Sequence, residues 1–346
     1  MIYFNNDYSE GCHPAVLEKL IQTNLVQTPG YGMDSYCKEA ADRIRMLCNK
    51  EDLSVHFLVG GTQTNLTVIS AALRPYQAVI SAASGHINVH ETGAIEACGH
   101  KIIALPAKDG KITARQIDVE TTSHFESADS EHMAQPGMVY ISHPTEYGTL
   151  YTLEELRHIH DVCRKHGILF FLDGARLGYG LAAPDTDVTL EDLANLCDVF
   201  YIGGTKVGTL FGEAVVIANP ALDRDFRYMI KQKGGMLAKG RLLGVQFGAV
   251  LEGGLYIRLG KHANCLADRI RQTLSDCGYR ELVETTTNQV FPVLPDSILT
   301  ELSKDFCFTE MERVDESHRC VRFCTSWATT EENVDALCHA IVRLSK

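Results

Sequence analysis

Short apolar segments alternate with helix-like segments between residues 54 and 219 of the chain. The segment at 168–173, ILFFLD, is almost fully apolar, which is typical of a parallel strand covered on both faces. Two capping signals, Thr152 with Glu155 and Thr189 with Asp192, mark helix starts between such segments. The pattern predicts an α/β fold with a mostly parallel sheet of seven strands, at 54–59, 77–81, 100–105, 137–142, 168–173, 198–204 and 213–219.

The period of the pattern changes after this region. From about Pro220 to Gly278 the chain is mostly helix-like, and residues 285–346 combine short strands with two helices. A length of 346 residues corresponds to about two domain lengths. We therefore expect a large domain over 1–250, in which helices flank the sheet, and a small α/β C-terminal domain over 251–346.

The charge balance is acidic, with 32 Lys and Arg against 44 Asp and Glu and a net charge of −12. This balance argues against a general nucleic-acid binder and against attachment to an anionic membrane surface. The longest apolar runs are too short to span a bilayer. We expect neither nucleic acid nor membrane as a partner, although one local basic pocket for a phosphate or carboxylate is compatible with the composition.

Twelve cysteines are scattered along the chain, and none forms a C-x-x-C pair. The N-terminal residues MIYFNNDYSE lack the basic and apolar regions of a signal peptide. These features predict a reducing, cytoplasmic compartment in which the cysteines are small buried hydrophobes.

The segment LVGGTQTN, 58–65, leads from a strand through two glycines into a helix. Free N–H groups at a helix start bind anions, and glycine lets a phosphate approach the backbone. Gly61 and Thr62 are therefore candidate phosphate ligands. A glycine turn with a threonine cap is the alternative interpretation.

Two further strand ends carry charged residues. Asp173, in FLDGARLG, closes a buried strand, where the active sites of parallel sheets collect. An ion pair between Asp173 and Arg176 that caps the next helix is the structural alternative. Lys206, in YIGGTKVGTLFG, lies among glycines that leave room for a bulky group at Nζ. A desolvated lysine can lose its proton, as imine chemistry requires, whereas most loop lysines are simply solvated.

The order of these residues indicates pyridoxal 5'-phosphate (PLP). This cofactor needs a lysine, an acid partner for its ring nitrogen, donors for its phosphate and a flat group against its ring. Lys206, Asp173, Gly61 and Thr62 supply the first three, and His86 in SGHINVHETGA supplies the fourth. As alternatives, His86 caps a helix or binds a metal with His90, but no third ligand lies nearby and we expect no metal.

The chain resembles the L-threonine aldolase and aromatic amino acid β-eliminating lyase family of PLP enzymes, which has the aspartate-aminotransferase-type fold, also called fold type I. The resemblance covers nearly the whole chain. It rests on NNDYSEGCHPAVLEKL near the start, GYGMD at 30–34, GGTQTN, GHINVHETGA, FLDGARL and GGTKVGTLFGEAVV.

The resemblance implies a role for each of these residues. Lys206 would form the Schiff base with the cofactor, and Asp173 would bind the ring nitrogen. His86 would stack on the ring and serve as a base or position one for the substrate hydroxyl. Gly61 and Thr62 would bind the phosphate.

The resemblance also implies ligands for the substrate. Arg176 and Arg322, the latter in CVRFCTSW, would hold the substrate carboxylate, and Arg176 would also border the cofactor. Asn6 occupies the position where the family often has a serine near that carboxylate. Lys239 and Arg241 are candidates for completing the phosphate site of a second subunit. Arg322 as a surface arginine, and Lys239 and Arg241 as solvated cations at a helix start, are the alternatives.

The implied activity is cleavage of L-threonine, L-allo-threonine or a related L-β-hydroxy-α-amino acid to glycine and an aldehyde. The chain departs from the family at SHPTEYG, 142–148, because Glu146 stands where aldolases carry a second histidine and His143 is displaced by three positions. Glu146 or a water would then take the base role. This departure leaves a bulkier substrate open.

Other functions are weighed beside the aldolase. A PLP-dependent β-eliminating lyase would release pyruvate and ammonia, and a non-catalytic relative would lack the lysine-bound cofactor. A nucleotide-binding Rossmann enzyme would need a glycine fingerprint that the first strand lacks. The resemblance further implies a homodimer or homotetramer with active sites shared between subunits.

Overall fold

Seven strands form one sheet in the order β2-β8-β7-β6-β5-β3-β4 in the computed structural model, which describes residues 1–346. Strands β3, β4, β5, β6 and β7 pair in parallel, and β8 runs antiparallel to both β2 and β7. The seven predicted strands and the mostly parallel sheet are thereby confirmed. The strands are β2 (Ser54–Leu58), β3 (Gln77–Ala82), β4 (Lys101–Leu105), β5 (Gln135–Ser142), β6 (Leu169–Asp173), β7 (Val199–Gly203) and β8 (Glu213–Ile217).

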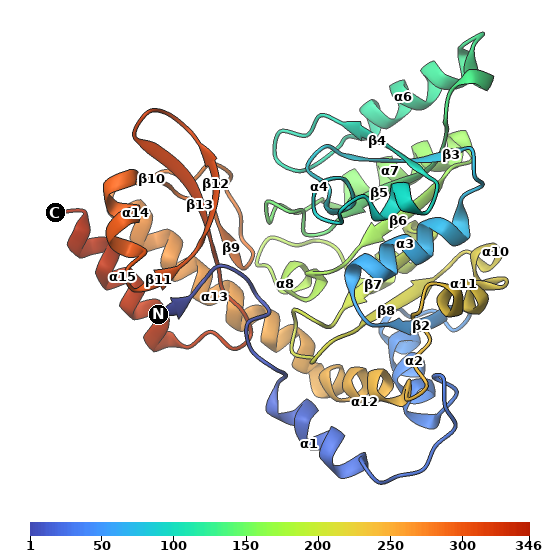
Figure 1. The fold of residues 1–346 in the computed structure, drawn as a ribbon, viewed down its shortest axis with the longest axis horizontal. Helices are drawn as coiled ribbons and strands as arrows, with labels where there is room; N and C mark the ends of the chain where they lie inside the picture. The colour runs from blue at the N-terminus through green and yellow to red at the C-terminus, as the bar shows by residue number, and fades with distance from the viewer.

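Helices cover both faces of this sheet (Figure 1). Successive residues of β6 enter different cores: Phe170 and Leu172 pack in one apolar cluster, and Phe171 packs in another. The predicted burial of this strand on both faces is confirmed. The helices of this unit are α1 (Pro14–Thr23), α2 (Ser35–Leu47), α3 (Gly61–Ala72), α4 (His86–Val89), α5 (Ala94–Ala97), α6 (Ala114–Glu126), α7 (Leu153–His166), α8 (Leu177–Leu181), α9 (Leu190–Leu196), α10 (Pro220–Asp223), α11 (Phe226–Gln232) and α12 (Arg241–Val250), with a 3-10 turn at Ser130–His132.

Both predicted capping signals form as capping boxes. At the start of α7, Thr152 Oγ1 accepts from the Glu155 amide at 3.2 Å, and Glu155 Oε2 accepts from the Thr152 amide at 2.8 Å. Thr189 and Asp192 make the same exchange at the start of α9. Each box satisfies amides that a helix start leaves unpaired.

A smaller unit, formed mainly by the C-terminal part of the chain, is built around a second apolar core (Figure 1). Its main sheet has the order β10-β13-β12, with β9 also paired to β13, and a separate parallel pair joins β1 to β11. Its elements are β1 (Ile2–Tyr3), α13 (Leu255–Asp276), β9 (Gln289–Val290), β10 (Val293–Pro295), α14 (Asp296–Leu302), β11 (Phe306–Cys307), β12 (Thr309–Arg313), β13 (His318–Cys324) and α15 (Glu331–Leu344), preceded by a 3-10 turn at Glu252–Gly254.

The two cores meet along helix α13. Ala263 packs in the core of the large sheet, whereas Leu266 packs in the C-terminal core. Phe4, at the other end of the chain, also belongs to the C-terminal core. The division into 1–250 and 251–346 stays a prediction, and the first residues of the chain lie with the C-terminal unit.

No single helix is long and apolar enough to cross a membrane. By length and composition alone, the bent pair Arg241–Val250 and Glu252–Asp276 meets that criterion together, with a bend of 53°.

Several chain segments that carry candidate residues end at one edge of the sheet. β6 ends at Asp173, β7 ends at Gly203, and α3 begins at Gly61 after β2. The turn after β6 lies so close to β7 that a Cβ on Gly174 would be 1.9 Å from the carbonyl oxygen of Tyr201. Glycine is therefore required at position 174, and the close approach brings the ends of the two strands together.

Candidate active site

Asp173 is the centre of a buried hydrogen-bond network at this edge, and it is only 3% exposed. Its Oδ2 accepts from Tyr140 Oη at 2.6 Å and from Asn65 Nδ2 at 3.0 Å. Its Oδ1 accepts from the Ala175 amide at 2.9 Å and from Tyr201 Oη. Burial, together with the Asp173 charge, raises the pKa of both tyrosines well above its ordinary value, so each stays a phenol that donates. Four donors thus hold this carboxylate in place.

The start of α3 lies next to Asp173. A Cβ on Gly61 would lie 3.3 Å from Tyr201 Oη, the same hydroxyl that donates to Asp173. The first intrahelical bond of α3 runs from the Thr64 amide to the Gly60 carbonyl oxygen at 3.0 Å. Amides before that bond have no intrahelical partner. The structure therefore brings the candidate phosphate ligands Gly61 and Thr62 close to the candidate ring partner.

Lys206 lies in the loop between β7 and β8. Its carbonyl oxygen accepts from Tyr179 Oη at 2.5 Å, whereas no hydrogen bond or ion pair forms at its Nζ, and the residue is half-buried. Burial and the neighbouring Arg176 charge lower the pKa of Lys206, against the opposite effect of Asp7 and Asp173. The amine is thus partly desolvated and unpaired, which differs from the solvated loop lysine that was the alternative.

His86 is connected to Asp173 through two intervening side chains. Its Nδ1 lies 2.7 Å from Glu91 Oε1, and Asn65 Nδ2 donates to that same oxygen at 2.7 Å as well as to Asp173. The His86 side chain is 33% exposed, whereas the Glu91 side chain is fully buried. The network fixes one edge of the imidazole and leaves part of the ring open.

Glu146 lies beside His86 with one oxygen bound and one free. Its Oε1 accepts from the His86 amide at 2.8 Å and from Ser142 Oγ at 2.6 Å. Its Oε2 accepts no hydrogen bond and is not enclosed. Burial raises the pKa of Glu146 against the lowering effect of Ser142. The arrangement presents a single carboxylate oxygen with an increased affinity for a proton.

His143, the other candidate in this segment, points elsewhere. It is fully buried, its Nδ1 accepts from the Tyr151 amide at 3.4 Å, and its Nε2 has no partner. Burial lowers the pKa of His143 to about 4. The histidine is therefore neutral and packed within the fold rather than available to a substrate.

Arg176 pairs with Asp7 and not with Asp173. Its Nε donates to Asp7 Oδ2 at 2.7 Å, and its Nη2 donates to Oδ1 at 3.1 Å. Asp7 is fully buried and also accepts from Asn288 Nδ2 at 3.0 Å. The Asp173–Arg176 ion pair considered from the sequence is therefore wrong: two Asp173 donors are tyrosines, and the guanidinium turns to the N-terminal segment.

Arg322 approaches the same N-terminal segment from β13. Its Nη2 donates to the Asn5 carbonyl oxygen at 2.9 Å, and its Nη1 donates to Gln289 Oε1 at 3.2 Å. Its Nε is buried without a partner. Such an orphaned donor is costly in a folded protein and marks a place where an acceptor fits. Arg322 is half-buried, unlike the surface arginine that was the alternative.

Asn6 is partly used by a local turn. Its Oδ1 accepts from the Tyr8 amide at 2.9 Å and from Ser9 Oγ at 3.0 Å. Its Nδ2 makes no hydrogen bond to the chain, so one donor of this side chain is free.

Lys239 and Arg241 lie far along the chain, just before and at the start of α12. Arg241 donates to the carbonyl oxygens of Thr23 and Val26 and thereby anchors the end of α1. Lys239 is exposed and forms no such contact. Of the two, only Lys239 keeps its charged group free for a second subunit.

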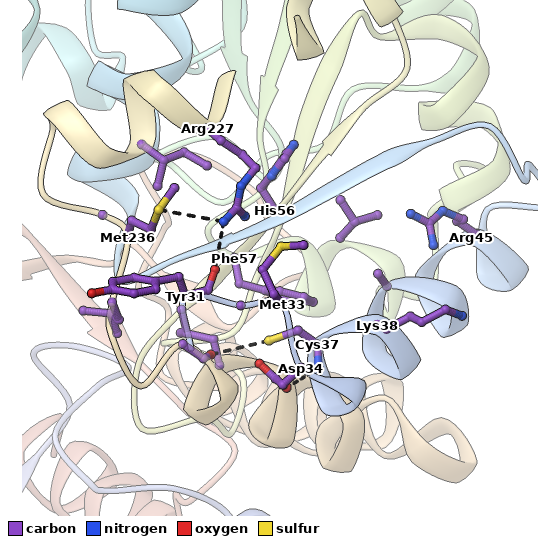
Figure 2. A pocket seen from close by; sticks show the side chains of 18 residues that line it. Tyr31, Met33, Asp34, Cys37, Lys38, Arg45, His56, Phe57, Arg227 and Met236 are labelled. Carbon is purple, nitrogen blue, oxygen red and sulfur yellow. Dashed lines mark hydrogen bonds between the residues drawn. The ribbon is translucent and has the colours of Figure 1, made fainter. Parts of the chain in front are cut away.

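Close to these residues, a cavity of about 310 Å³ lies between α2, β2 and the segment leading into α12 (Figure 2). Tyr31, Met33, Asp34, Arg227 and Met236 are among its lining residues, and none of the candidate cofactor ligands lines it. The cavity is therefore separate from the Lys206 site.

Five residues of the site are not predicted from the sequence, although all lie in the sequence motifs described above or beside them. A carboxylate five positions after a candidate histidine, or an amide four positions after Gly61, gives no signal of its own. The five residues are Asp7, Asn65, Glu91, Tyr140 and Tyr201.

The donor set fits PLP. A partly desolvated amine, a carboxylate fixed at a strand end, a helix start with free amides and an orphaned guanidinium donor lie around one sheet edge. These are the groups that the amine linkage, ring nitrogen and phosphate of PLP and the carboxylate of an amino acid need.

Comparison with known proteins identifies relatives along the whole chain. The family model for β-eliminating lyases matches residues 8–297. A low specificity L-threonine aldolase from Pseudomonas sp. (strain NCIMB 10558) is 29% identical over 342 residues, which cover 96% of this chain and 95% of that protein.

Solved structures give the same result. A threonine aldolase structure from Leishmania major superposes with a TM-score of 0.97 at 45% identity and covers 100% of both chains. Aspartate aminotransferase from Thermus thermophilus superposes with a TM-score of 0.72 at 12% identity, covering 99% of this chain and 91% of that one. The latter likeness concerns the fold alone, and it confirms the predicted fold type I.

Proposed function

Because the chain belongs to the β-eliminating lyase family of PLP-dependent enzymes, we propose that it is an aldolase that cleaves L-β-hydroxy-α-amino acids. The substrates would be L-threonine, L-allo-threonine or a relative with another side chain, and the products would be glycine and an aldehyde. One observation carries the assignment: Lys206 is partly desolvated at a point where the charges of both Arg176 and Asp173 act on its amine. The curated and solved relatives named above as threonine aldolases support the choice of reaction.

Bound PLP would supply a conjugated ring that accepts the electron pair released when the Cα–Cβ bond breaks. Lys206 would hold the cofactor through its Nζ. Asp173, fixed by four donors, would keep a proton at the ring nitrogen. The Gly61 and Thr62 amides would bind the phosphate, and the partly open His86 ring would lie against the cofactor.

The substrate carboxylate would be held from the C-terminal unit. Arg322 offers its orphaned Nε, and Asn6 offers its free Nδ2. Arg176 is already paired on one side with Asp7, so it would add charge and its remaining N–H groups rather than a full two-bond contact. Guanidinium suits this task because it stays protonated.

Glu146 would take the proton of the substrate β-hydroxyl at Oε2. The carboxylate is held at Oε1 by His86 and Ser142, so its free oxygen has a defined direction. The raised pKa of Glu146 makes it a stronger base than an ordinary carboxylate. His143 is excluded from this role because it is buried against Tyr151.

We further propose that active sites are shared in a homodimer or homotetramer. Several large apolar side chains on α1 and the segment after it are exposed: Ile21 is 68%, Leu25 92% and Met33 66% exposed. Large exposed apolar side chains favour an interface with another protein where they form a patch. Lys239 would then supply a cation to the phosphate site of the partner subunit.

We propose that the enzyme works in the reducing cytoplasm. All twelve cysteines are free thiols. Six of them are buried, among them Cys163 and Cys197, but five are half-buried and Cys265 is exposed, so the prediction that the cysteines are buried holds for half of them. Thiols in apolar surroundings act as small packing residues.

A product assay tests the function. The purified chain with added PLP is incubated with β-hydroxy amino acids and with β-substituted alanines, and glycine, aldehyde, pyruvate and ammonia are measured. Glycine and aldehyde in equal amounts are expected. Pyruvate and ammonia alone would establish β-elimination instead, and a Lys206→Ala variant with an unchanged cofactor spectrum would indicate a non-catalytic relative.

A further inference from the structure

Glu213 is a buried carboxylate beside Lys206 that the proposed mechanism does not use. It is the first residue of β8, is 3% exposed, and pairs in register with Gly203, the last residue of β7. The pair closes the loop 204–212 that carries Lys206. A carboxylate in such a place is costly unless its charge and its oxygens are satisfied.

Both oxygens of Glu213 bind the residues immediately before the lysine. Oε2 accepts from the Gly204 amide at 3.1 Å, and Oε1 accepts from Thr205 Oγ1 at 2.8 Å. Thr205 Oγ1 in turn accepts from the Gly212 amide at 3.0 Å at the other end of the loop. One side chain thus ties both ends of the loop together, so the backbone position of Lys206 depends on it.

The charges around Lys206 oppose one another. Burial and Arg176 favour the neutral amine, whereas Asp7, Asp173 and Glu213 favour the protonated one. Among these acids, only Glu213 belongs to the hairpin that carries the lysine.

Four groups interact electrostatically with Glu213: Lys206, Asp173 and the hydroxyls of Tyr201 and Tyr256. Burial raises the pKa of Glu213, and the Lys206 charge lowers it, so the charges of the two groups are mutually dependent.

We propose that Glu213 is the positioning residue of Lys206: its two hydrogen bonds fix the loop that presents the amine, and they hold a carboxylate within the hairpin that carries the lysine. This role rests on the assignment of Lys206 in the proposed function. It gives a reason for a carboxylate in a buried strand whose neighbouring residues, Ala214 and Val215, are apolar.

The test measures the reactivity of Lys206 toward an amine-selective acylating reagent as a function of pH. The full chain is labelled without cofactor, and the peptide containing Lys206 is quantified by mass spectrometry. Removing a nearby negative charge disfavours the ammonium form of Lys206. Glu213→Gln is therefore expected to lower the midpoint pH of the Lys206 labelling curve by about one unit. Glu281→Gln is the matched control, because Glu281 is a partly buried acid in the C-terminal unit whose charged neighbours, such as Arg271, lie outside the loop. Its midpoint should equal that of the wild type.

Two further variants separate charge from folding. Glu213→Asp keeps the charge and is expected to keep the midpoint near the wild-type value. If Glu213→Gln does not fold, Thr205→Val removes one donor to the carboxylate, which makes Glu213 harder to ionise and should lower the midpoint by a smaller amount.

An unchanged midpoint in folded Glu213→Gln, or in Thr205→Val, would overturn the proposal, as would an equal shift in Glu213→Asp and Glu213→Gln. The labelling uses neither cofactor nor substrate. If the wild-type chain fails to bind PLP or to release glycine, the proposed function fails while the labelling result on Glu213 stands.

Discussion

Arg176 and Asp7 form a two-bond ion pair across 169 positions of sequence, with Nε to Oδ2 at 2.7 Å and Nη2 to Oδ1 at 3.1 Å. The pair joins the turn after β6 to the segment that follows β1. Because β1 pairs with the C-terminal unit, this contact connects the Lys206 edge of the large sheet to the unit that carries Arg322. The geometry of the proposed substrate site therefore depends on a salt bridge made by the first few residues of the chain.

The first prediction concerns the loss of this pair. Asp7→Asn leaves the Arg176 guanidinium buried without a counter-charge, which typically costs about 3–5 kcal/mol of unfolding free energy. Equilibrium denaturation measures this loss directly. Asp335→Asn, in an exposed pair with Arg269, is the control and should change stability by less than about 1 kcal/mol. Equal effects of the two variants would refute the special role of Asp7.

The same pair predicts a pH dependence. Burial alone would raise the pKa of Asp7, but the charges of Arg176 and Lys206 and the hydrogen bonds lower it to about 2. Since the folded value lies below the unfolded one, the ionised pair contributes stability above about pH 4, and this contribution is lost as the pH falls toward 2. Denaturation series between pH 5 and pH 2 should therefore show a smaller acid-induced loss in Asp7→Asn than in the wild type.

Tyr201 supports the second prediction, because its hydroxyl donates to Asp173 and lies beside Gly61. Tyr201→Phe removes one donor to a buried carboxylate, worth roughly 1.5–3 kcal/mol. We expect the dissociation constant of PLP to rise about tenfold or more, measured by absorbance titration. Tyr279→Phe is the control, since that hydroxyl accepts from Ser345 Oγ at 3.0 Å within the C-terminal unit. Unchanged PLP affinity in Tyr201→Phe would show that the tyrosine does not stabilise the cofactor site.

How far the sequence predicts this fold depends on whether a feature is local. The apolar run before Asp173 indicates a buried strand, and the glycines around Lys206 indicate a turn. The strands and the ends that carry these two residues could therefore be predicted from the sequence. The partner of Arg176 does not follow, because an ion pair between residues 176 and 7 is visible only once both cores have formed. The contacts of Arg241 with the end of α1 are equally non-local, and they occupy a cation that the sequence left free.

The third prediction concerns Glu146. Burial raises the pKa of this carboxylate in the free enzyme, so the acid limb of kcat/KM against pH should lie above that of an ordinary carboxylate. Glu146→Gln keeps the shape but removes the base, and we expect kcat to fall roughly 10²–10⁴-fold with loss of that limb. Stopped assays of glycine release across pH 5 to 9 measure both effects. An acid limb that persists unchanged in Glu146→Gln would assign the proton transfer to another group.

The fourth prediction separates Arg322 from Arg176. Arg322 has an unpartnered buried Nε, whereas the Nε and one Nη of Arg176 are bound to Asp7. Arg322→Lys keeps the positive charge but loses the planar pair of donors that matches a carboxylate. We therefore expect KM for the amino acid to rise by about ten- to a hundredfold, while the PLP affinity and the melting temperature stay near the wild-type values. Arg319→Lys is the matched control: Arg319 also lies on β13, but its partners are Asp296 and Glu310. An equal KM for Arg322→Lys and the wild type would place the carboxylate on Arg176 alone.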